Sequence, residues 1–238
     1  METKDLPNYG LGFSGLMSDT LYIKQMDRQM RREFSKDLGF WTMLRWMLPM
    51  RSETKRVQDL DWSGLTRRGI PRKFIDNVSS LIATYKSLVD LIGKERASGA
   101  FFRVWDRTAY DPSDTHFPSA MQLKSCGDAF LAYKDWMKAF EAADEKKGLF
   151  ETVTLEDDNN AYVWEETYCG FNEIARKCGS PYLAYPSLCY WEEAYMPALG
   201  ANAGWKFSRD LALSKGDKVC RNRLERIIPR ARSSIRPL

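Results

Sequence analysis

The last third of the chain carries the side chains whose types and spacing could do chemistry. Cys189 lies at the predicted start of a helix, and Glu192 and Glu193 follow within one turn. A thiol at a helix N-terminus gains from the positive end of the helix dipole, which lowers its pKa and favours the thiolate. Because Glu192 stands three residues after Cys189, both share one helix face. The pattern predicts a nucleophile with a general base, or an acid–base pair acting on a C–N bond. The alternative is a buried structural thiol beside acids that stabilise the first helical turn.

Arginine on a predicted strand offers a way to hold a substrate. Arg209 alternates in phase with Trp205 and Phe207, so it is expected to point into an aromatic cavity, where its guanidinium could bind a carboxylate through two hydrogen bonds. Arg221 lies on the next strand. For both arginines the alternative is a cross-strand charge pair on the surface. Five more residues are candidate pocket walls, although such residues are ordinary core residues by default: Trp164, Tyr168, Cys169, Tyr190 and Cys220.

The residue counts limit the chemistry. The chain has one histidine, His116, and five cysteines with no CxxC spacing. A multi-histidine metal site is therefore excluded within one chain, and a histidine-based triad could run only through His116, which lies in a proline-bounded loop. An odd number of cysteines and a charged N-terminus without an apolar signal core predict reduced thiols and a cytoplasmic protein. We expect no metal and no cofactor.

Nucleic acid is a minor alternative partner. The net charge is only +4, but residues 215–238 hold eight basic side chains and two acidic ones, a pattern that could follow a phosphate backbone. Tyr190, Glu193 and Pro197 faintly resemble a motif of the tRNA-dependent cyclodipeptide synthases. The serine motif and the alternating β/α units of those enzymes are absent, as are P-loop and Rossmann signatures.

Periodicity predicts the elements that must position these residues. Apolar side chains recur every three or four residues over 73–93, and helices are also expected over 127–147, 171–178 and 188–198. Residues 150–155 and 161–169 form a predicted hairpin. In its second strand Tyr162, Trp164, Glu166 and Tyr168 share one face. Further strands are expected over 205–213 and 219–227. The predicted fold is α+β, with N-terminal helices packed on an antiparallel sheet formed mainly by the C-terminal half.

The N-terminal part is less regular. Residues 1–20 are expected to be an irregular arm and residues 21–34 a helix. Residues 41–48 form a short apolar segment that Pro49 should stop. This segment contains Arg45 and is too short to span a bilayer, so it should pack on the core or form one side of a lid; a membrane-surface anchor is the minor alternative. We expect one domain over 1–238, mainly helical over 21–148, with hairpins and short helices over 149–228 and a basic tail over 229–238.

The last 90 residues or so resemble the L-2-amino-thiazoline-4-carboxylic acid hydrolase family. The resemblance rests on small elements in order: a strand ending in a cysteine, a short helix closed by glycine, a cysteine with an acid three residues on, and a Gly-Asp turn leading to a cysteine and an arginine. Here these are Cys169, Gly179, Cys189 with Glu192, Gly216 with Asp217, and Cys220 with Arg221. The family position held here by Glu192 is usually Asp.

The resemblance implies an enzyme in which water attacks a C=N or C–N bond of a small carboxylated heterocycle. Glu192 or Glu193 would activate water or protonate nitrogen, Cys189 would be nucleophile or site wall, and Arg209 would hold the carboxylate. A role in secondary metabolism fits this chemistry. The alternatives are a cyclase or isomerase of the same fold, and a non-catalytic protein that binds a small molecule. The expected partner is a small-molecule substrate, with no membrane; the oligomeric state is open.

Overall fold

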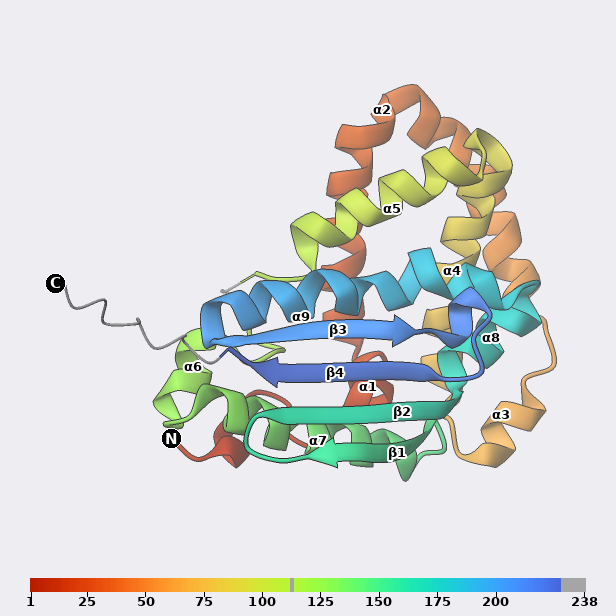
Figure 1. Cartoon of the computed structure of the whole chain (residues 1–238). Coiled ribbons are helices and arrows are strands. Elements are labelled where there is room, and N and C mark those ends of the chain that lie inside the picture. Colours follow the sequence, from red (N-terminus) through yellow and green to blue (C-terminus); the bar gives the residue numbers. More distant parts are fainter. Residues whose placement is uncertain (112–113, 228–238) are drawn as a thin grey trace, which may run out of the picture.

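The computed structural model describes residues 1–111 and 114–227, and it has the expected α+β architecture (Figure 1). Four strands form one antiparallel sheet in the order β1-β2-β4-β3, made of two hairpins that meet at β2 and β4. The strands are β1 (Phe150–Asp157), β2 (Ala161–Cys169), β3 (Trp205–Leu211) and β4 (Cys220–Arg226). The predictions of the hairpins and of the sheet in the C-terminal half are confirmed.

Helices cover one face of this sheet and extend beyond its β3 edge. α7 and α9 pack against the strands, and α2, α4 and α5 form a helical group next to α9 (Figure 1). The helices are α1 (Gly12–Leu16), α2 (Thr20–Gln58), α3 (Ser63–Arg68), α4 (Arg72–Ile92), α5 (Lys94–Thr108), α6 (Ala120–Ser125), α7 (Ala129–Glu145), α8 (Gly170–Cys178) and α9 (Tyr190–Ala203).

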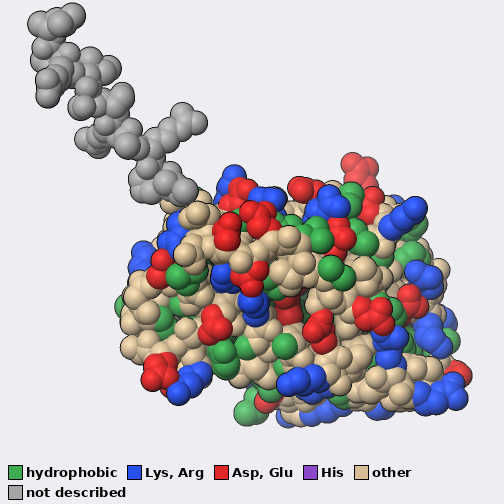
Figure 2. All heavy atoms as spheres, turned by 60° about the horizontal axis from the view of Figure 1, so that its bottom comes forward, with side chains coloured by type: hydrophobic (Ala, Val, Ile, Leu, Met, Phe, Trp, Pro, Cys, Tyr) green, Lys and Arg blue, Asp and Glu red, His purple; other side chains and the backbone are tan. Residues whose placement is uncertain are grey.

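Strand alternation separates the two faces of the sheet. On β4, Cys220, Asn222 and Leu224 are buried against the helices, and the intervening side chains point the other way. The outward side chains form cross-strand ion pairs, Arg221 with Glu165, Arg223 with Glu156 and Lys206 with Glu225, and Arg223 also pairs with Glu225 on its own strand. Acidic and basic side chains are intermixed over the face that is turned forward in Figure 2.

The expectation that Pro49 stops a helix is wrong. α2 runs from Thr20 to Gln58 through Pro49, and its backbone leaves helical geometry at Gly39, where φ is 72° and ψ is 163°. Tertiary packing outweighs the cost of the proline here. Buried Trp46 donates its indole N–H to Ser87 Oγ of α4 at 2.8 Å and holds this half of α2 in place.

Residues 1–20 are packed more tightly than an irregular arm. They include α1, and Leu6, Leu16 and Met17 are buried. The carboxylate of Asp144, on α7, accepts hydrogen bonds from the backbone amides of Phe13 (2.6 Å) and Ser14 (2.9 Å). This buried anchor fixes the N-terminal segment on the core.

The structure also bears on the helix α5, on membrane spans and on the C-terminal tail. α5 begins directly after Gly93 and is not among the expected helices, although Ala97, Ala100, Phe101, Val104 and Trp105 recur at helical spacing along its buried face. No helix within 1–111 and 114–227 is long and apolar enough to cross a membrane. The tail 229–238 lies outside the described residues, and the single domain stays a prediction.

Candidate functional site

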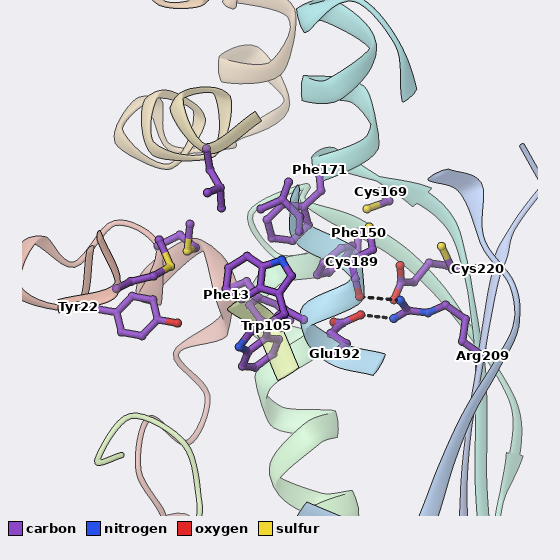
Figure 3. A pocket seen from close by; sticks show the side chains of 16 residues that line it. Phe13, Tyr22, Trp105, Phe150, Cys169, Phe171, Cys189, Glu192, Arg209 and Cys220 are labelled. Atoms are coloured by element: carbon purple, nitrogen blue, oxygen red, sulfur yellow. Dashed lines mark hydrogen bonds and ion pairs between the residues drawn. The ribbon is translucent and has the colours of Figure 1, made fainter. Parts of the chain in front are cut away.

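A cavity of about 70 Å³ lies between the inner face of the sheet, α9 and the N-terminal helices (Figure 3). One end is polar, with Glu166, Glu192 and Arg209. The thiols of Cys169, Cys189 and Cys220 border this end. The rest of the wall is apolar or aromatic: Phe13, Met17, Tyr22, Met26, Leu81, Trp105, Phe150, Phe171, Leu188 and Trp191. A concave apolar site with a few convergent polar groups is typical of small-molecule binding.

Strand register brings the polar groups together. Glu166 of β2 stands opposite Cys220 of β4, and Asn222 of β4 stands opposite Arg209 of β3. All four side chains lie on the buried face of the sheet. Cys189 and Glu192 approach them from above, since Cys189 is the residue before α9 and Glu192 lies in its first turn.

Arg209 is the cation at the centre of this arrangement. Its side chain is only 4% exposed and forms an ion pair with Glu192. The guanidinium also donates from Nε to Asn222 Oδ1 at 2.7 Å. Its Nη1 donates to the carbonyl of Cys189 at 3.3 Å (Figure 3). The inward direction of Arg209 agrees with the alternation in the sequence. A substrate carboxylate at this arginine would have to compete with Glu192.

Glu166 is the group that the sequence analysis did not single out. Burial raises its pKa to about 7, and the negative charge of Glu192 acts in the same direction. Arg209 and a 3.2 Å hydrogen bond from Asn222 Nδ2 oppose this shift. In the sequence, Glu166 could have been found as the lone carboxylate on the strand face that also carries Tyr162 and Trp164. A carboxyl that titrates near neutrality in a cavity can both take up and release a proton.

A β-bulge lets Glu166 and Cys169 reach the same cavity. Glu151 pairs with Tyr168 and Thr152 with Glu166, so Thr167 has no partner on β1. This extra residue interrupts the alternation. Tyr168 therefore leaves the face on which regular alternation placed it. It packs against Arg68, whose guanidinium carbon is 3.7 Å from the ring centroid, and does not line the cavity.

The expectation of a low pKa for Cys189 is wrong. Burial raises the pKa of this thiol to about 12, and neighbouring Glu192 adds to the effect. Cys189 is not at the start of the helical segment but at the end of a π-helical turn, Tyr185–Cys189, that continues into α9. Burial likewise raises the pKa of Cys169 and Cys220. Among the residues the structure describes, no cluster of His, Cys, Asp and Glu has a metal-binding arrangement.

Two candidates at the start of α9 lie just outside the cavity. Glu193 accepts a hydrogen bond from Tyr185 Oη at 2.6 Å, and its carboxylate is 3.9 Å from Arg209 Nη1. Tyr190 donates its hydroxyl proton to Asp106 at 3.0 Å. Glu193 therefore lies next to the Arg209–Glu192 pair, whereas the hydroxyl of Tyr190 is directed to α5.

The remaining candidates lie apart from the polar end. Arg221 pairs with Glu165 on the opposite face of the sheet. This is the surface charge pair that the sequence analysis gave as the alternative to substrate binding. Trp164 is buried in the core under α7 and α9. His116 Nδ1 is 2.8 Å from Asp114 Oδ1, and its ring packs on Tyr22, a residue of the apolar wall.

The fold and the cavity together define an α+β protein with a mostly apolar cavity that is polar at one end. Residues 72–224 match the L-2-amino-thiazoline-4-carboxylic acid hydrolase family, and because this is more than half of the chain, the protein belongs to that family. The match confirms the resemblance and extends it upstream to α4 and α5. Neither the curated proteins nor the solved structures gave a match. At family level the chain is a hydrolase-like small-molecule enzyme.

Proposed function

We propose that this protein hydrolyses a C=N or C–N bond of a small cyclic substrate bound in the cavity, with Glu166 as the proton-transfer group. One observation carries the proposal: Glu166 lies at the polar end of an otherwise apolar cavity, where burial raises its pKa to about 7. Family membership supports the reaction class. We also propose that the protein acts in the cytoplasm and in secondary metabolism.

The chemistry proceeds by addition and elimination of water. As the water oxygen bonds to the substrate carbon, the π pair of the C=N bond moves to nitrogen. Glu166 takes a proton from water and delivers it to that nitrogen. The adduct then forms a C=O bond while the C–N bond breaks, and the hydroxyl proton passes through Glu166 to the leaving nitrogen. The protein supplies the proton carrier and holds the substrate in place.

The other polar groups have supporting roles. Glu192 neutralises Arg209 and helps to set the pKa of Glu166. Glu193 supports the pair from behind, through its contact with Tyr185. Because its pKa is raised to about 12, Cys189 acts as a neutral thiol in the wall, where it can donate a weak hydrogen bond, and not as a nucleophile.

Mass spectrometry and one pair of variants test this function. The wild-type protein is incubated with L-2-amino-thiazoline-4-carboxylate and with larger cyclic amidines, and products are expected to gain one water. Glu166→Gln should lower kcat by about 10²–10⁴-fold, which is the usual contribution of a general acid or base. Glu165→Gln is the matched control, since Glu165 is the adjacent residue but pairs with Arg221 outside the cavity. Equal activity of Glu166→Gln and wild type would refute the role of Glu166.

The mostly apolar wall also favours a second candidate, a cyclase or isomerase, because such a wall limits the access of water. A product of unchanged mass in the same assay would assign it. A nucleic-acid role has less support: Arg221, Arg223 and Arg226 are ion-paired, and Arg230, Arg232 and Arg236 lie outside the described residues.

A further inference from the structure

An apolar groove of about 410 Å³ lies beside the cavity, between the two halves of α2 and the face of α4. We call it the methionine groove, because five methionines line it. Most of its lining is apolar and includes Met26, Met30, Met43, Met47, Met50 and Leu81, while Lys24, Asp27, Arg31 and Arg51 are among its polar lining residues. Unbranched thioether side chains adapt to ligands of different shape, which suits such a surface to a variable apolar chain.

The groove is open to the outside. Gly39 breaks α2 with a positive φ of 72°, so that the chain turns and the second half of the helix faces the first. Phe40 is 70% exposed and Leu44 is 48% exposed at its rim. Contiguous exposed apolar side chains of this kind mark binding surfaces in soluble proteins.

The groove and the cavity share part of their walls. Met26 and Leu81 line both spaces, so these side chains stand between them. A cavity of about 70 Å³ holds only a small head group. Cavity and groove together reach the size of a typical pocket for a larger ligand, roughly 300–1,000 Å³.

We propose that the methionine groove binds the apolar tail of the substrate whose head occupies the cavity. The substrate class is then amphipathic: a C=N-containing polar head at Glu166, and a hydrocarbon or aryl tail that passes Met26 and Leu81. The two spaces adjoin at Met26 and Leu81, and the unbranched Met26 side chain can move aside to join them, which favours this occupant over a separate partner. The assignment of the head rests on the proposed function, whereas the tail site rests on the shape and lining of the groove.

A homologous series of n-alkyl amidines, from acetamidine to dodecanamidine, tests the tail site by isothermal titration calorimetry below micelle-forming concentrations. Affinity for the wild-type protein should rise by about fourfold per added methylene until the groove is filled. Leu44→Glu and Met47→Glu should remove this rise without changing the binding of the shortest amidines. Both positions are partly exposed, so the variants are expected to fold. Leu155→Glu, at an exposed apolar position on β1, is the matched control and should keep the full rise.

Each alternative outcome has a defined meaning. Affinity that does not depend on chain length overturns the proposal, and so does a rise that persists in Leu44→Glu and Met47→Glu. Binding to phosphatidylglycerol vesicles that both variants abolish, without chain-length dependence in solution, would assign the groove to a membrane surface instead. A length-dependent affinity together with full hydrolysis by Glu166→Gln would leave the tail site standing and remove the proposed function. Hydrolysis that requires Glu166, together with an affinity that does not depend on chain length, would leave the proposed function standing and remove the tail site.

Discussion

Two adjacent glutamates illustrate how much depends on the direction of one side chain. Glu165 points to the outer face of the sheet and pairs with Arg221, whereas Glu166 points inward and titrates near neutrality. The difference comes from the two-residue period of the strand, which turns neighbouring side chains to opposite faces. The surroundings of the inner carboxyl, and not its chemical type, make it suitable for proton transfer.

Glu192→Gln is expected to lower the pKa of Glu166. The substitution removes a negative charge that raises this pKa and leaves Arg209, which lowers it, without its main counter-charge. If the Glu166 carboxylate is the base, the acidic limb of the kcat/KM profile should move to lower pH, and a pH series on both proteins measures the shift. Glu193→Gln is the control, because Glu193 lies outside the cavity and is hydrogen-bonded to Tyr185, so it should move the limb much less. A limb that stays fixed or moves to higher pH in Glu192→Gln would contradict the assignment.

Sequence patterns could predict Arg209 and Glu192 in the cavity, because both positions follow regular periodicity. They could not predict Glu166 as a titrating group, because its pKa depends on how deeply the helices bury the sheet. They also placed Tyr168 on the wrong face, since the bulge at Thr167 cannot be seen in alternation. They could not predict the raised pKa of Cys189, because it comes mainly from burial of the thiol by the packed helices and sheet.

At the scale of elements, the close approach of α9 to β3 sets the geometry of the site. Gly200 of α9 lies so near Trp205 that an added Cβ would be 2.5 Å from the backbone oxygen of that residue. The approach carries the start of α9, with Glu192, to Arg209 on β3. Sequence periodicity predicts α9 itself. The distance between α9 and the sheet depends on this packing, so periodicity cannot predict it.

Gly200→Ala should therefore destabilise the protein by about 1–3 kcal/mol, since the extra methyl meets backbone that cannot move aside easily. Urea unfolding measures the loss. Gly64→Ala is the matched control: it lies in helix α3 with no atom near the added Cβ, and the substitution should leave stability unchanged or raise it by a few tenths of a kcal/mol. Equal stabilities for the two variants would show that α9 and β3 can separate freely.

At the scale of the whole molecule, the interior holds several carboxyl groups that folding makes less acidic. Burial raises the pKa of Glu166 to about 7, that of Asp144 to about 6, and that of Glu141 well above its usual range. In the pH interval between the unfolded and the folded pKa, the folded state keeps a proton that the unfolded state has lost. Each group therefore contributes stability at low pH that is lost as pH rises through its folded pKa.

Glu166→Gln should accordingly be more stable than the wild type at pH 8, by about 2–3 kcal/mol, although its kcat is expected to be lower. The neutral amide keeps an oxygen for the hydrogen bond from Asn222 and avoids burying a charge. The difference should shrink below pH 4.5, where the glutamate is protonated in both states. Urea midpoints at pH 4 and pH 8 measure it. A variant that is less stable than the wild type at both values would show that the carboxylate is well stabilised in the folded state.

The wall of the cavity has two origins along the chain. The polar end comes from residues 72–224, the part that matches the family, while Phe13, Met17, Tyr22 and Met26 come from the segment before it. Reactivity and selectivity can therefore diversify separately during evolution. A lineage that alters its first 71 residues would acquire new substrates while keeping the same proton chemistry. Chimeras in which only this segment is exchanged would transfer substrate preference between family members.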